Sequence, residues 1–246
     1  MSDMPGPDSC EFDNSGVIVG DFANSISLKH TQISDSNCTY INSDHTPVAV
    51  INSHLTEGGM SKPYIQAKGA AVEVIESNLT NSDDSMTSKG RGLNCIECTS
   101  VAVQSSEFEG LQGYLGGAIF LQDSSEVKIE NTEFNANQAR QGGAIYLLNS
   151  DLTLTDNRFN SNSVKAPEMD ETFTRNLISV VQELGKGGAI FYTCLDEENE
   201  RNKFVATQVC EDNNQNCDEK GKLSYYRFKS YENDLDILSS SDLTNE

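Results

Sequence analysis

Residues 116–162 read GGAIFLQDSSEVKIENTEFNANQARQGGAIYLLNSDLTLTDNRFNSN, and this stretch contains one sequence unit twice. Each copy has Gly-Gly-Ala-Ile, an apolar–polar–apolar triplet and Phe-x-x-Asn, at 116–119, 127–129 and 134–137 and again at 142–145, 152–154 and 159–162. A third Gly-Gly-Ala-Ile stands at 187–190. Self-similarity with a period of about 20–50 residues is typical of solenoids and other repeat proteins.

The same spacing extends toward the N-terminus through four further units. In all six units an apolar residue follows the first residue of the triplet by seven positions, which gives the pairs Ile26/Ile33, Val48/Leu55, Val72/Leu79, Val101/Phe108, Val127/Phe134 and Leu152/Phe159. An earlier apolar residue precedes each triplet by seven or eight positions, at Ile18, Ile41, Ile65, Leu93, Ile119 and Ile145. Three apolar sites per unit in constant register predict three short strands per coil.

An apolar–polar–apolar triplet places its two apolar side chains on one face of a strand. A single coil cannot bury that face, but stacked coils pair in parallel at about 4.8 Å and enclose a continuous core. We therefore predict an all-β chain that forms one solenoid segment over 1–246, a right-handed parallel β-helix of about 7–9 coils. The triplet residues and the residues seven positions later should form two buried columns. Small polar residues should form inner ladders at Thr31, Ser53, Ser77, Ser106, Thr132 and Asn157 and at Ser36, Ser82, Asn137 and Asn162.

Residues 163–186 interrupt the repeat as a predicted helical insertion. Residues 172–184 (TFTRNLISVVQEL) have the apolar spacing of an amphipathic helix. The side chains of Phe173, Leu177 and Val181 would either pack on the flank of the solenoid or dock a partner.

Residues 194–221 are polar and acidic, which predicts a long external loop. A disulfide between two of the residues Cys194, Cys210 and Cys217 could close this loop. The acidic runs 196–200 and 211–214 lack the spacing of a calcium loop, so we expect no cofactor, with calcium as the alternative. After the loop Phe228 matches a third-strand residue, and Leu235 and Leu243 match a first and a second strand.

The combination of Gly-Gly-Ala-Ile with Phe-x-x-Asn, at Phe134 to Asn137 and Phe159 to Asn162, resembles the repeats of chlamydial polymorphic outer-membrane proteins. The run GGAIFYTC at 187–194 is similar to runs in the giant β-helix surface proteins of ciliates. As a pattern, the resemblance extends from residue 10 to about 194. It implies a passenger or ectodomain that presents a long solenoid outside the cell, for adhesion or surface architecture.

The charge balance argues against nucleic acid as a partner. The chain has 38 Asp and Glu against 17 Lys and Arg, a net charge of −21, which repels phosphate. No apolar run approaches the roughly 18 residues of a membrane span, so we expect no direct span in this segment. The N-terminus also has no visible signal peptide, as in an intracellular protein or a mature segment of a longer precursor.

Two further features bear on the cellular compartment. Asn37 and Asn78 begin glycosylation sequons, which are usable only in a secreted chain. Cys95 and Cys98 form a CxxC that could be a disulfide, a pair of buried thiols or half of a zinc site. We expect an extracellular or cell-surface location.

The residues that we expect to point outward from the strands do not include a recognisable catalytic set. The outer residues of the second strands are Ser27, Ala49, Glu73, Ala102, Lys128 and Thr153, which include neither paired carboxylates nor the regular threonine face of an ice-binding solenoid. His30, His45 and His54 have no triad partners, and a turn explains the pair Asp83-Asp84. We therefore expect a non-enzymatic structural or adhesive segment of a larger cell-surface or secreted protein. A carbohydrate-active β-helix enzyme and an intracellular scaffold subunit are the alternatives.

The register starts and stops within a coil, and neither end has an amphipathic cap. A bare solenoid end exposes strand edges and apolar core. We expect further coils or protein partners at both solenoid ends.

Overall fold

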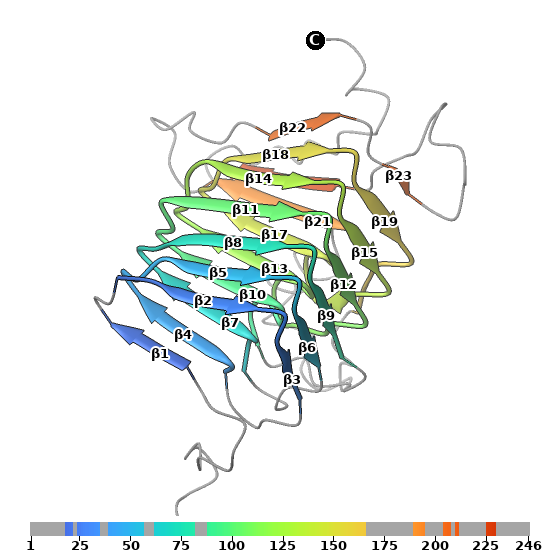
Figure 1. Ribbon diagram of the computed structural model, residues 1–246. Coiled ribbons are helices and arrows are strands. Elements are labelled where there is room, and N and C mark those ends of the chain that lie inside the picture. The colour runs from blue at the N-terminus through green and yellow to red at the C-terminus, as the bar shows by residue number, and fades with distance from the viewer. Residues whose placement is uncertain are drawn as a thin grey trace, which may run out of the picture.

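The computed structural model describes residues 18–21, 24–34, 39–56, 62–81, 88–165, 189–194, 204–207, 210–211 and 225–229. These residues form a stack of short strands that turn repeatedly around one axis (Figure 1). The regular structure of this part of the chain is entirely β, and every strand pair in it is parallel. The all-β parallel solenoid predicted from the sequence is confirmed.

Three long sheets run the length of the stack, and a short fourth sheet lies at one corner. The first sheet contains β1 (Ile18–Asp21), β4 (Ile41–Asp44), β7 (Ile65–Lys68), β10 (Leu93–Ile96), β13 (Ile119–Gln122), β17 (Ile145–Leu148), β21 (Ile190–Cys194) and β24 (Tyr225–Lys229). The second contains β2 (Ile26–Lys29), β5 (Val48–Ile51), β8 (Ala71–Ile75), β11 (Ser100–Gln104), β14 (Val127–Glu130), β18 (Leu152–Thr155) and β22 (Phe204–Thr207). The third contains β3 (Gln32–Ile33), β6 (His54–Thr56), β9 (Asn78–Thr80), β12 (Glu107–Glu109), β15 (Glu133–Asn135), β19 (Arg158–Asn160) and β23 (Cys210–Glu211). The fourth pairs β16 (Gln138–Ala139) with β20 (Ser163–Val164).

The strand register confirms the two predicted columns. In the second sheet Val101 is the partner of both Val72 and Val127, and in the third sheet Phe134 lies between Phe108 and Phe159. The constant step of seven residues works because the second-sheet strand and the corner after it together span the same number of residues in each of these coils. The inward residues of all three sheets form one continuous apolar core.

Most corners are turned by a single residue in the left-handed region, with φ between 47° and 65°. Between the first and second sheets these residues are His45, Gly69, Glu97, Asp123 and Asn149, and between the second and third they are His30, Asn52, Glu76, Ser105, Asn131 and Asp156. The corner that begins at Asp123 contains a second left-handed residue, Glu126. Such a residue reverses the in–out alternation, so the next side chain points into the core. One residue per corner thus bends the chain without disturbing the ladder of backbone hydrogen bonds.

The residue that follows each corner between the second and third sheets is one of the small polar residues predicted to form an inner ladder. Hydrogen bonds between successive coils confirm this ladder. The backbone N–H of Thr31 donates to the hydroxyl of Ser53, and that of Ser53 donates to the hydroxyl of Ser77. The pattern continues through Ser106 and Thr132 to the amide oxygen of Asn157. Each hydroxyl therefore satisfies a backbone donor of the preceding coil that no strand partner reaches.

The second predicted ladder is confirmed where the structure describes it. The Asn162 amide oxygen accepts the backbone N–H of Asn137, and the Asn137 amide oxygen accepts that of Leu111. Each amide NH₂ donates to the carbonyl of a Phe one coil earlier, Phe134 and Phe108 respectively. Ser36 and Ser82 lie outside the described residues.

Replacing Ser77 by Ala should lower the free energy of unfolding by about 1–3 kcal/mol, the usual cost of leaving a buried donor without a partner. The Ser77 hydroxyl is fully buried, accepts from the Ser53 backbone and donates to the carbonyl of Ile75. Urea unfolding followed by circular dichroism would measure the change. The exposed Ser27→Ala is the control and should change stability little; equal losses for both variants would contradict the assigned role of the ladder.

The segment after Asn162 differs from the prediction. Residues 163–164 form β20 rather than the start of an insertion. The predicted helix at 172–184 and its side chains Phe173, Leu177 and Val181 lie outside the described residues. That helix stays a prediction.

Two strands lie within residues 194–221, where the sequence predicted one external loop. β22 pairs with β18 and β23 pairs with β19, so the second and third sheets continue there. The loop prediction is wrong for these two stretches. Phe228 belongs to β24 of the first sheet, opposite Thr193, and its assignment to a third strand is also wrong. Leu235 and Leu243 lie outside the described residues.

Candidate functional site

Among the side chains that the structure describes on the outer face of the second sheet, Glu73 and Lys128 are not neighbours. Glu73 and Lys128 both point outward, and Ala102 lies between them in the register. Groups that must exchange a proton need hydrogen-bond proximity, directly or through one water. A carboxylate and an amine two coils apart do not meet this requirement. Asp83 and Asp84 lie outside the described residues.

A polar groove follows the corner between the second and third sheets. Two hollows of about 500 and 350 Å³ lie along this corner, and Asn78 lines both of them. The larger hollow is lined by Asn78, Ser105, Ser106, Glu107, Asn131, Thr132, Glu133, Asp156, Asn157 and Arg158, and the smaller by His30, Thr31, Gln32, Asn52, Ser53, His54, Glu76 and Asn78. We call this surface the corner groove.

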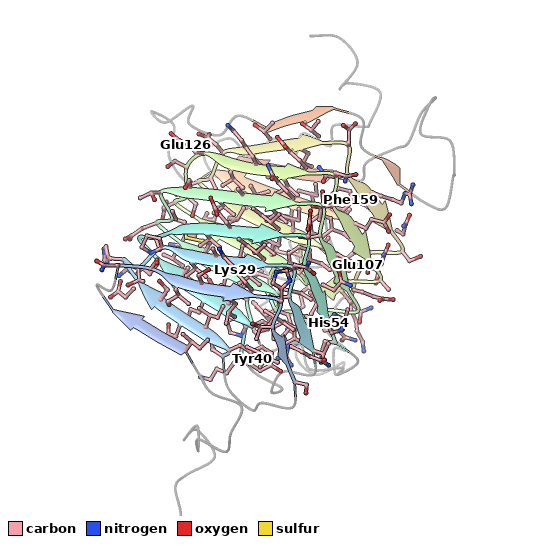
Figure 2. The ribbon with its side chains drawn as sticks, in the orientation of Figure 1. Lys29, Tyr40, His54, Glu107, Glu126 and Phe159 are labelled. Atoms are coloured by element: carbon pink, nitrogen blue, oxygen red, sulfur yellow. A yellow bond between two sulfur atoms is a disulfide. The ribbon has the colours of Figure 1, made fainter. Side chains whose placement is uncertain are left out.

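Three parallel columns build the corner groove. The left-handed corner residues form one wall, the inner ladder forms the floor, and the first outward residues of the third-sheet strands form the other wall. Figure 2 labels His54 and Glu107 on that third sheet. The strand register fixes the spacing of all three columns along this corner.

The electrostatics of the groove are predominantly negative. Glu76, Glu107, Glu133 and Asp156 contribute carboxylates, and Arg158 is the cation of the larger hollow. The Arg158 Nη1 lies 3.0 Å from the Glu133 Oε1 in a half-exposed ion pair. An exposed pair of this kind contributes at most about 1 kcal/mol to stability. The groove therefore offers hydrogen-bonding groups to a polar ligand and disfavours an anionic one.

The three histidines lie at two different corners of the solenoid. His30 and His54 both line the smaller hollow, whereas His45 turns the first-to-second corner. The Nδ1 of His45 lies 2.6 Å from the carboxylate of Asp44, and both side chains are about half exposed. The sequence predicted surface histidines, and all three reach the surface. Within the described residues, three or more metal-ligating side chains do not come together.

The predicted modification sites are described in part. Asn78 is exposed at the start of β9, while Asn37 lies outside the described residues. Cys95 and Cys98 form a disulfide, which resolves the three alternatives for this CxxC. Cys194 ends β21 and Cys210 begins β23, but their side chains and Cys217 lie outside the described part, so their pairing stays a prediction.

An aromatic stack on the outer face of the first sheet was missed at the sequence level. The rings of Phe120 and Tyr146 lie 5.5 Å apart and those of Tyr146 and Phe191 lie 5.0 Å apart, both pairs nearly parallel. These three side chains are buried beside Ile96, Leu115 and Leu148 and form a second apolar cluster. The signal was present, because an aromatic residue follows each of the three Gly-Gly-Ala-Ile motifs.

The corner groove was also missed, because its walls are scattered through six units of the sequence. Only the register brings Glu76, Glu107, Glu133 and Asp156 to one surface. Neighbouring positions in the groove are about 25 residues apart in the chain, a spacing at which no local motif is visible.

The chain matches a known protein family over most of its length. Residues 15–194 match the family described as the right-handed β-helix region. Searches of curated proteins and of solved structures found no match. The part of the chain that the structure describes has no helix long and apolar enough to cross a membrane. The match covers well over half of the chain and agrees with the parallel stack of coils, and the chain therefore belongs to the right-handed β-helix family.

Proposed function

We propose that this chain is a non-enzymatic structural or adhesive segment of a larger cell-surface or secreted protein. The observation that carries the proposal is the unbroken register of three sheets. The buried positions carry mostly apolar and small polar residues, with Arg91 and Gln141 as exceptions, while the outward positions vary from coil to coil. Such a rigid rod serves to hold side chains at fixed positions along its length.

The corner groove is the proposed contact surface. Its carboxylates Glu76 and Asp156 make no side-chain hydrogen bond or ion pair within the described part of the chain. A preformed backbone lowers the entropic cost of binding. The net charge of −21 adds long-range attraction for cationic partners. Nucleic acids and other polyanions are not the proposed partners.

The proposed location is outside the cell. The resemblance to chlamydial polymorphic outer-membrane proteins and to giant ciliate surface proteins supports it. The disulfide Cys95–Cys98 and the exposed sequon asparagine Asn78 are also typical of secreted chains.

We also propose that further coils or a protein partner pack against the ends of the solenoid. β1, β2 and β3 lie at one edge of their sheets. In this first described coil Ile26 and Leu28 are 7% and 8% exposed, whereas Val48 and Val50 below them are 2% and 0% exposed. A strand edge without a partner is a template for another strand.

The alternative of a carbohydrate-active enzyme is tested by removing the groove carboxylates. We expect the unmodified chain to release no reducing ends or unsaturated sugars from polygalacturonate or xylan. The variant Glu107→Gln/Glu133→Gln/Asp156→Asn should then give the same background rate. The control variant Glu73→Gln/Glu97→Gln/Glu126→Gln removes three exposed carboxylates outside the groove.

The non-enzymatic proposal would be overturned if the unmodified chain and the control variant formed product and the groove variant did not. A loss of about 100-fold or more is the usual consequence of removing one catalytic acid or base. Chromatography of the digests measures it directly.

A further inference from the structure

The Cys95–Cys98 disulfide lies inside the core rather than on the surface. Cys95 points inward from β10 and Cys98 follows the corner residue Glu97, whose φ is 54°. The two residues are 0% and 1% exposed. The bond therefore spans the corner between the first and second sheets from the inside.

The neighbouring coils show that this corner accepts other side chains at the same two positions. Cys95 pairs in register with Ala67, and Ala67 pairs with Ser43. In the coil of Ser43 the hydroxyl of that residue donates to the carbonyl of Thr46, across the same corner. The corner thus brings the inward residue two positions before the left-handed residue close to the residue that follows it. The disulfide joins these two positions through their side chains, where Ser43 makes a hydrogen bond to the backbone of Thr46.

We infer that this disulfide forms before the coils stack on one another and is inaccessible to thiols and disulfides afterwards. Thiol–disulfide exchange requires a thiolate to approach one sulfur atom directly. In the folded chain Cys95 lies between Ala67 and Leu121 of the adjacent coils, and the backbone N–H of Cys98 donates to the Ser124 hydroxyl. A reagent reaches the sulfur atoms only if these coils separate.

The chemistry requires a two-electron oxidant, and the one proposed here carries a disulfide, such as oxidised glutathione or a protein disulfide. One cysteine thiolate attacks the oxidant, forms a mixed disulfide and releases one thiol. The second cysteine then displaces the other half as a second thiol. The new S–S bond forms as both cysteines lose their protons and the oxidant is reduced to two thiols. Folding to this state consequently takes place where such an oxidant is supplied.

Stabilisation by loop closure does not account for the position of this bond. The entropic gain from a disulfide grows with the length of the closed loop, and this loop has a sequence separation of only 3. The inference concerns how and where the chain folds, and it stands apart from the proposed adhesive role.

The experiment uses the unmodified chain made in an oxidising secretory host. Trypsin cuts after Arg91 and Lys128, and the peptide 92–128 contains Cys95, Cys98 and no other cysteine. Dithiothreitol is added to the native protein and, in parallel, to protein unfolded in guanidinium chloride. Samples are acid-quenched at intervals, unfolded, treated with N-ethylmaleimide and digested, and mass spectrometry counts the labels on this peptide.

We expect reduction of the native protein to be at least tenfold slower than reduction of the unfolded protein. Equal rates would overturn the inference, as would a peptide labelled twice before any reductant is added. The variant Cys95→Ser/Cys98→Thr copies the residues of the Ser43–Thr46 corner. Its far-UV spectrum should match that of the unmodified chain, because the corner forms without the covalent bond; failure of this variant to fold leaves the rate comparison on the unmodified chain intact.

Discussion

Replacing Phe134 by Ala is expected to lower the free energy of unfolding by about 3–5 kcal/mol, the usual cost of deleting a core aromatic ring. Phe134 is fully buried, and its ring centroid lies 5.2 Å from that of Phe108 and 4.7 Å from that of Phe159. Both ring pairs are stacked nearly parallel. The substitution therefore opens a cavity in the middle of a column and removes two ring contacts at once.

Guanidinium unfolding followed by circular dichroism measures this loss. Phe134→Leu keeps an apolar side chain at the position and should cost clearly less than Phe134→Ala. Tyr114→Ala removes an exposed aromatic side chain and should cost less than about 1 kcal/mol, as surface substitutions do. A loss below about 1 kcal/mol for Phe134→Ala would contradict the stacked core.

Replacing Gly142 by Ala is expected to cost about 3 kcal/mol or more. Gly142 has a φ of 61°, a conformation that costs an L-residue about 1–2 kcal/mol. A Cβ there would also collide with the carbonyl oxygen of Ile145, which is backbone and cannot move aside. Overpacking of this kind adds about 1–3 kcal/mol. The first glycines of the preceding coils, Gly90 and Gly116, meet the carbonyl oxygens of Leu93 and Ile119 in the same way.

The control for Gly142 comes from a corner that tolerates a side chain. Ala136 and Ser161 have φ values of 52° and 53° at the corner that follows the third sheet. A left-handed residue therefore does not need to be glycine where the surroundings are open. Ser161→Ala should change the unfolding free energy by less than about 0.5 kcal/mol, as at an exposed site. A similarly small change for Gly142→Ala would show that the collision is absent.

The fold could be predicted from the sequence because the inward positions carry most of the sequence constraint. The position that Val127 occupies must be filled by an apolar residue in the next coil as well. The buried columns are therefore visible in the sequence as a constant spacing of apolar residues. The ladder of Ser77 and Asn157 was predictable for the same reason, since a buried corner donor needs a short side-chain acceptor. The apolar columns and the polar ladder both lie within one unit, and each recurs at the same number of residues from its neighbours in every unit.

The corner groove and the outer aromatic stack were not predicted, because outward positions carry no such constraint. Glu76 and Asp156 line the smaller and the larger hollow, and only the accumulated register of several coils aligns them along one corner. The strands β22 and β23 were missed for two reasons, although the step of seven residues from Phe204 to Glu211 is kept. The step from Ile190 to Phe204 is 14 residues rather than seven or eight, and the third-strand position of this coil holds the acidic Glu211 rather than an apolar residue.

The strand register itself is tested most directly by engineered cysteines on the outer face of the second sheet. Glu130 and Thr155 are register partners in adjacent coils, and Gln104 pairs with Glu130 from the coil on the other side. Adjacent parallel strands lie about 4.8 Å apart, within the Cα separation that a disulfide spans, whereas strands two coils apart lie about 10 Å from each other. Trypsin places residues 130 and 155 on the peptides 129–140 and 141–158, neither of which contains a native cysteine.

Mild oxidation of the variant Glu130→Cys/Thr155→Cys should therefore yield these two peptides joined by one disulfide. Under the same conditions the variant Gln104→Cys/Thr155→Cys should yield no link between its two engineered positions. Failure of the first pair to join, or joining of the second pair in monomeric protein, would contradict the stacked register on which the proposed function rests.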